Sequence, residues 1–179
     1  MEQQLFEILL LFSFYCILGW ITEVFGFALN GAGYQNRGIC RGPYLLSYGT
    51  GAVAVLYADE YIRENVELGD FPEIAAVFLL GAAAGLTLGL LSKGIIDGIS
   101  GAKLVCLKWY QPLLCGFGAV IMIFHLNPVL TAFISWMTPW VHMIFLLVFW
   151  MRFLPEIIDG IYALWKYRKK NRHILKNQE

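Results

Sequence analysis

Long apolar runs separated by short polar turns dominate the pattern along this chain. A helix needs about 20 mostly apolar residues to cross the roughly 30 Å of hydrocarbon in a bilayer, because lipid cannot satisfy exposed backbone groups. The pattern therefore predicts about five crossings, near residues 5–29, 44–58, 74–92, 104–126 and from 139 onward. The second run is the weakest, since it is short, contains glycine and is rich in hydroxyl groups. A re-entrant loop there, with four crossings in all, is the alternative.

Two stretches in the second half depart from a plain crossing. The fourth run carries Lys108 and Pro112 in its first half. Uncharged residues then continue from Val129 to Met151, which is longer than one membrane thickness needs, and Pro139 interrupts them. We therefore predict a short interfacial segment over residues 128–137, followed by the fifth crossing.

Composition strengthens this interpretation. Residues of the set AVILMFWYC make up 59% of the 179, only 15% are charged, and the mean hydropathy is +0.63. Soluble domains carry about 25% charged residues, so the composition excludes disorder and favours an all-α polytopic integral membrane helix bundle. The net charge of +0 gives no support to a nucleic-acid partner. The first run lacks a basic start and a cleavage-site pattern, so we expect a retained helix rather than a cleaved signal.

Basic residues set the predicted orientation, because lysine and arginine are retained on the cytoplasmic side of a membrane. They concentrate in the C-terminal residues 166–179, which places the C-terminus inside. Counting back through five crossings places Arg37 and Arg41 inside and the N-terminus outside. We expect one transmembrane domain over residues 1–165 and a basic cytoplasmic tail over residues 166–179.

A dense group of small, aromatic and polar residues follows the first apolar run. It consists of Gly19, Trp20, Glu23, Asn36, Arg37, Gly38, Gly42, Pro43, Tyr48, Gly49 and Gly51. Their order and spacing resemble the N-terminal pattern of a bacterial family of small membrane proteins, the CmpB-like ABC transporter permeases of the type IV group. That pattern has a GW-x-x-E helix end, an NRG turn, a GP turn and a Y-G-x-G entry into the next helix.

The resemblance extends further along the chain with two departures. Residues 101–128 are similar to the family's fourth helix, and Asp159 is similar to an acid near the end of its last helix. Leu86-Thr87 stands where the family has a third-helix glutamate, and Ile99-Ser100-Gly101 stands where it has a WDY-type turn. The chain therefore looks like a divergent member.

The resemblance implies a multi-pass protein of the bacterial plasma membrane that forms part of a transport system for a small solute. The chain has no G-x-x-x-x-G-K-[ST] motif, so a separate ATPase subunit would have to supply ATP hydrolysis. A non-transporting accessory or assembly subunit that binds other membrane proteins is the alternative. An intramembrane enzyme acting on lipid needs a nucleophile and a base within reach, and the spacing of hydroxyls, histidines and acids indicates none. We therefore expect no enzyme activity, and no catalytic residue is predicted.

The candidate binding residues lie around Glu23, which shares a helical stripe with Gly19. A carboxylate inside the bilayer is costly and usually faces a partner or a water-filled cavity. Our hypothesis is that Glu23, Asn36, Arg37 and Tyr48 line a polar pocket at the cytoplasmic mouth, for substrate or coupling ion, with Arg41 as a second nearby cation. The alternative is that Glu23 and Arg37 only pin the loop against the first helix.

Gly81, Gly85 and Gly89 repeat at steps of four in the third run. Small residues at this spacing let two membrane helices approach closely, either within the chain or in a homo-oligomer. Two charged groups sit near predicted helix ends and are candidates for ion pairing or a relay: Lys93 with Asp97, and Arg152 with Glu156 and Asp159. The four cysteines show no metal-ligand spacing, so we expect neither a metal nor a cofactor.

Overall fold

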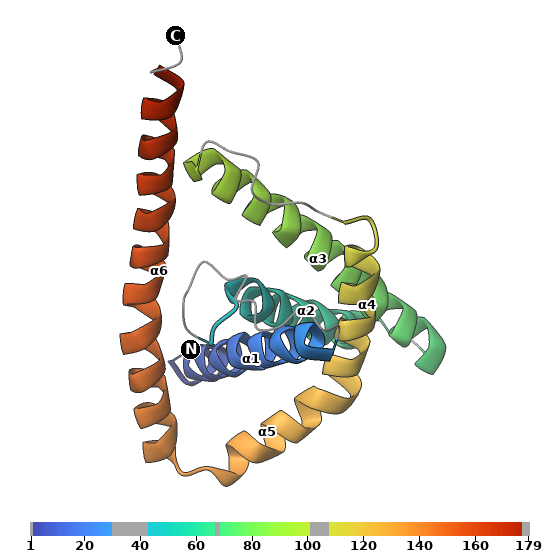
Figure 1. Ribbon diagram of the computed structural model, residues 1–179. Helices are drawn as coiled ribbons and strands as arrows, with labels where there is room; N and C mark the ends of the chain where they lie inside the picture. The colour runs from blue at the N-terminus through green and yellow to red at the C-terminus, as the bar shows by residue number, and fades with distance from the viewer. Residues whose placement is uncertain (1, 30–42, 67–68, 101–107, 177–179) are drawn as a thin grey trace.

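The computed structural model describes residues 2–29, 43–66, 69–100 and 108–176, and over these ranges the regular structure is helical throughout. The elements are α1 (Glu2–Leu29), α2 (Leu46–Asn65), α3 (Asp70–Ser100), α4 (Gln111–Ile121), the π-helical segment η1 (Met122–Leu126), α5 (Asn127–Trp136) and α6 (Pro139–Lys176). Figure 1 shows α1 and α2 side by side near the centre, with α4 to their right and α5 below them. α6 runs along the left side of the molecule in this view.

Four helical stretches of the described chain are long and apolar enough to cross a membrane. They are Leu5–Phe25, Asp70–Ser100, Gln111–Trp136 and Pro139–Lys169. The weakest of the predicted crossings is also a helix, α2 of 20 residues, but it lacks the hydropathy of the other four. The chain is therefore a polytopic membrane helix bundle, and α2 packs within it between α1 and α3.

The charged end of α2 extends beyond its predicted limit. The prediction ended this helix at residue 58, whereas it continues through Asn65. Asp59 and Arg63 are one turn apart and form an ion pair with 2.8 Å between Nε and Oδ2. Such a pair stabilises a helix. The charged residues after position 58, which are typical of a loop, therefore form two further turns of α2.

The segment predicted over residues 128–137 is not a separate element. α4, η1 and α5 form one helical rod from Gln111 to Trp136. Pro128 has no N–H to donate, and just before it the amide of Asn127 bonds to the carbonyl of Met122, five residues back. The wider π-helical turn thus absorbs the proline without ending the helix, and the rod bends there (Figure 1).

The start of this rod also differs from the prediction. The predicted first residues, 104–107, lie outside the described residues, and Lys108 lies in the turn before the helix rather than within it. Pro112 occupies the first turn of α4, where the N–H that proline lacks would have no helical partner anyway.

Small residues bring α3 and α4 into close contact. A Cβ on Gly81 would clash with Ala119, and a Cβ on Gly85 would clash with Cys115. On the other side of this contact, a Cβ on Gly116 would lie 2.8 Å from the backbone oxygen of Phe78. The glycine stripe of α3 therefore serves packing within the chain at these two positions, while Gly89 lies half-buried further along α3.

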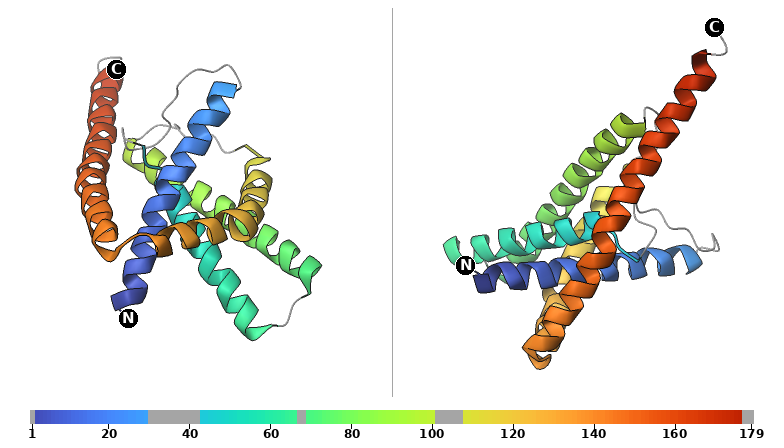
Figure 2. Two further views of the ribbon diagram at one scale, coloured as in Figure 1. Left: turned by 90° about the horizontal axis from the view of Figure 1, so that it is seen from below. Right: turned by 90° about the vertical axis from the view of Figure 1, so that its left-hand side faces the viewer.

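α6 packs against α1 and α3. It crosses α1 steeply and continues without a break past residue 165 to Lys176 (Figures 1 and 2). Phe149 and Phe153 are buried against Cys16 and Tyr44. Near its far end, the Arg168 guanidinium donates a hydrogen bond of 3.4 Å to the carbonyl of Gly98, which ties α6 to the end of α3.

Candidate functional site

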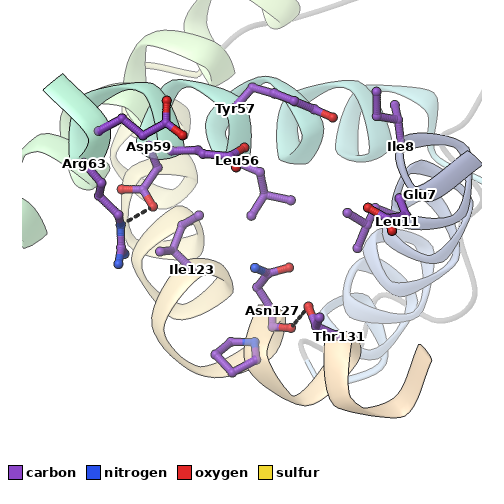
Figure 3. A pocket seen from close by; sticks show the side chains of 13 residues that line it. Glu7, Ile8, Leu11, Leu56, Tyr57, Asp59, Arg63, Ile123, Asn127 and Thr131 are labelled. Carbon is purple, nitrogen blue, oxygen red and sulfur yellow. Dashed lines mark hydrogen bonds and ion pairs between the residues drawn. The ribbon is translucent and has the colours of Figure 1, made fainter. Parts of the chain in front are cut away.

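An open cavity of about 620 Å³ lies between α1, the end of α2 and the bend of the α4–α5 rod (Figure 3). Its lining residues are Glu7, Ile8, Leu11, Leu56, Tyr57, Asp59, Glu60, Arg63, Glu64, Ile123, Asn127, Pro128 and Thr131. A volume of this size suits a small solute, and a mixed apolar and polar lining is typical of ligand sites.

Arg63 organises the α2 wall of the cavity. Besides Asp59, its guanidinium pairs with Glu73 on α3 at 2.7 Å and lies 5.8 Å from the ring centre of Phe124 in η1. Asp59 is almost fully buried, so its carboxylate depends on this partner. One side chain therefore connects α2, α3 and the π-helical segment at the edge of the cavity.

The opposite wall is built around Asn127, at the bend. The Tyr15 hydroxyl of α1 donates to Asn127 Oδ1 at 3.2 Å. The Thr131 hydroxyl donates to the Asn127 carbonyl at 2.8 Å (Figure 3). π-helical turns often occur at functional sites. Here the turn presents an amide side chain to the cavity and links it to α1.

Charge in the cavity is unbalanced. Four carboxylates, of Glu7, Asp59, Glu60 and Glu64, line it with a single guanidinium, that of Arg63. A cleft lined mainly by one sign of charge raises the local concentration of the opposite ion, so this cavity favours cations over anions. Within the part of the chain that the structure describes, no group of three or more histidine, cysteine or acidic side chains could hold a metal ion.

A second polar contact joins the other end of α1 to the start of α2. The Tyr48 hydroxyl donates to Glu23 Oε1 at 3.3 Å. The two side chains can meet because Gly19 leaves room beneath the Tyr48 ring, where a Cβ would clash. Two of the predicted binding residues are therefore in contact, about 24 Å along α1 from Glu7 at 1.5 Å per residue.

The remaining residues of the N-terminal pattern divide into two sets. Asn36, Arg37, Gly38, Arg41 and Gly42 lie outside the described residues. Among the others, Gly49 lies against Cys16 and the backbone of Phe12, and Gly51 faces the Leu88 side chain. Trp20 lies half-buried on α1, and Pro43 lies three residues before the start of α2. The described glycines of the pattern thus serve close approach between helices.

The two predicted charged groups lie near the C-terminal end of α3 and along α6. Lys93 and Asp97 are half-buried in the last turns of α3. Arg152 and Asp159 are exposed on α6, with Glu156 half-buried between them.

The cavity residues were not singled out from the sequence. Their signal was present in two pairs spaced by four, Asp59 with Arg63 and Glu60 with Glu64. The predicted second run ends at residue 58, so these pairs fall in the connection after it, where a four-residue spacing carries no meaning. Because this segment is helical, residues four apart lie on the same side of α2.

Comparison with known proteins gives one family. The model of the family described as "Putative ABC-transporter type IV", ABC_trans_CmpB, matches residues 10–163. This range holds the described residues of the N-terminal pattern and nearly all of the cavity lining. No curated protein and no solved structure matches the chain.

Proposed function

The chain belongs to the family described as "Putative ABC-transporter type IV", and on that premise we propose that it is a permease-type component of a transport system for a small solute. The proposal places the protein in a bacterial plasma membrane, with a separate ATPase subunit as the source of energy and no covalent chemistry of its own. The observation that carries it is the open, polar cavity among helices that are otherwise apolar.

The proposed route follows the α1–α2 pair. The cavity at Glu7 and Arg63 opens at the end predicted to face outward, and the Glu23–Tyr48 contact lies toward the end predicted to face the cytoplasm. Gly49 and Cys16 close the space between the helices on the way from one to the other. Solute would enter at the cavity and reach the polar pair when the α1–α2 contact loosens.

Binding to the purified full-length protein tests this proposal. We expect putrescine, a small dication, to raise the thermal unfolding midpoint more than succinate, a dianion of similar size, because carboxylates dominate the cavity. The double variant E60Q/E64Q should lose the putrescine effect. Its matched control, D159N, changes an exposed acid on α6 and should keep it.

Equal shifts with both compounds, or the same loss in D159N, would contradict a cation-selective cavity. A midpoint that E60Q/E64Q lowers without any ligand would indicate a structural effect, so the ligand-free proteins are compared first.

A second candidate function is an accessory or assembly subunit, alone or as a homo-oligomer. It is favoured by the low burial of the spanning helices, of which α3 and α6 bury 11% and 17% of their most apolar windows. Native mass spectrometry of gently extracted protein separates the two functions. Co-purification of an ATPase favours transport, whereas a stable complex with another membrane protein that persists in an E23Q/R37A variant favours assembly.

A further inference from the structure

Four side chains near the end of α6 form one stripe, which we call the aromatic–basic stripe: Tyr162, Trp165, Lys166 and Lys169. Their spacing of three, four and seven residues places them on one face of the helix. All four are exposed. The rings of Tyr162 and Trp165 lie 6.1 Å apart, and the Lys169 ammonium lies 5.7 Å from the centre of the Trp165 ring.

This stripe faces away from the bundle. Phe149 and Phe153, on the opposite face of α6, are buried. Arg168 also leaves the stripe, because its guanidinium bonds to the carbonyl of Gly98 at the end of α3. Arg168 is thus engaged in helix–helix contact, whereas its neighbours Lys166 and Lys169 point to the surroundings.

Helix length places the stripe at headgroup depth. Starting from Pro139, about 30 Å of hydrocarbon at 1.5 Å per residue ends roughly 20 residues later, near Asp159. The headgroup layer occupies about the next 5–8 Å, so Tyr162 lies within it and Trp165 at its outer edge. The Cα atoms of the two lysines lie roughly 10–15 Å past Asp159, and side chains on a helix tilt toward its N-terminus, so the long lysine stems extend back toward this layer. At the other boundary, Trp136 and Trp140 are exposed by 83% and 75%, as an interfacial aromatic belt requires.

We propose that the aromatic–basic stripe binds the phosphate of an anionic lipid headgroup in the leaflet next to the C-terminal end of α6. Tryptophan and tyrosine rings sit at this depth while lysine stems extend along them and carry the ammonium groups to the phosphate. Charge complementarity supports a lipid occupant, because six basic residues and no acid lie between Asp159 and Glu179. Basic clusters directly beyond a membrane span attract anionic lipid at about 1 kcal/mol per residue.

Lipid retention by the purified full-length protein tests the proposal. Native mass spectrometry with phosphatidylglycerol and phosphatidylethanolamine at equal concentration should show preferential retention of phosphatidylglycerol. The double variant K166Q/K169Q should lower that preference about 30-fold at low salt, which corresponds to about fivefold for each lysine. Raising the ionic strength should weaken the preference of the unmodified protein in the same direction.

Two control variants separate the stripe from charge in general. R168Q removes the same charge beside the stripe and should change the preference less than twofold, whereas K166R/K169R keeps the charge and should keep the preference. An equal loss in R168Q, or no preference in the unmodified protein, would overturn the proposal. So would an acidic protein that co-purifies through Lys166 and Lys169 without any lipid preference.

Discussion

The two ends of the α1–α2 pair are held in opposite ways. Toward the Glu23 end, Gly19 and Gly49 bring the helices so close that a single Cβ would clash. Toward the Glu7 end, charged side chains of α2 turn to α3 through Arg63 and leave a cavity of about 620 Å³ beside α1. In a membrane, where no hydrophobic effect drives helices together, close contact comes from small residues. The same helix pair can thus be closed at one end and open at the other.

The largest expected effect is on the closed end. Gly49→Val places a side chain against Cys16 and the Phe12 carbonyl, 2.9 Å from the position of a Cβ. The Phe12 backbone cannot move away from the new side chain as a flexible side chain could. We therefore expect the free energy of unfolding to fall by about 3 kcal/mol. Unfolding of the purified protein with increasing SDS measures this. Gly118→Val is the matched control, since a Cβ there meets open space, and an equal loss in both variants would refute the close-contact argument.

A smaller loss of stability is expected at the open end of the α1–α2 pair, near Glu7 and Arg63. Arg63→Gln leaves Asp59 buried without its ion pair and removes the link to Glu73. Because half of the Arg63 side chain is exposed, solvent screens part of the effect, and we expect a loss of about 1–2 kcal/mol. The same SDS titration applies. Arg152→Gln, an exposed cation on α6, should change stability little. A neutral result for Arg63→Gln would mean that the ion pairs do not hold the cavity wall.

The smallest expected change in stability comes from the contact between Glu23 and Tyr48. Tyr48→Phe removes the hydroxyl that donates to Glu23 but keeps the ring above Gly19. A hydrogen bond of 3.3 Å between partly exposed groups contributes about 0.5 kcal/mol, so stability should barely change. Tyr61→Phe, at a tyrosine that is 68% exposed, is the control. A loss above about 2 kcal/mol at Tyr48 alone would show that the contact is a structural pin rather than a site open to a ligand.

The fold was largely predictable because it depends on apolar runs, and the departures from the prediction lie where contacts between helices decide the local structure. The break predicted before residues 128–137 is absent because a π-helical turn accommodates Pro128, and Met122 and Ile123 of that turn pack in one core cluster with Tyr15 of α1. The second helix was ended too early because charges after residue 58 resemble a loop until Glu73 of α3 is seen beside Arg63. Both cases need a contact between residues distant in sequence.

The candidate site was predictable in part. Glu23 and Tyr48 were expected in one place and are in contact, whereas Asn36, Arg37 and Arg41 lie outside the described residues and stay predictions. The cavity could not be foreseen, because it forms from α1, α2 and the bend of the α4–α5 rod together.

The sequence by itself determined the membrane class, the family and the helix-forming runs, since each of these follows from composition, spacing and local order along the chain. Only the tertiary structure decided that Gly81 and Gly85 contact α4 and that Arg63 reaches α3. It also decided that a cavity lies between α2 and Glu7 of α1. The physical reason is that the type of a residue does not identify its partner. Whether a glycine or a charged side chain forms a close contact or borders a cavity depends on which helix packs against it.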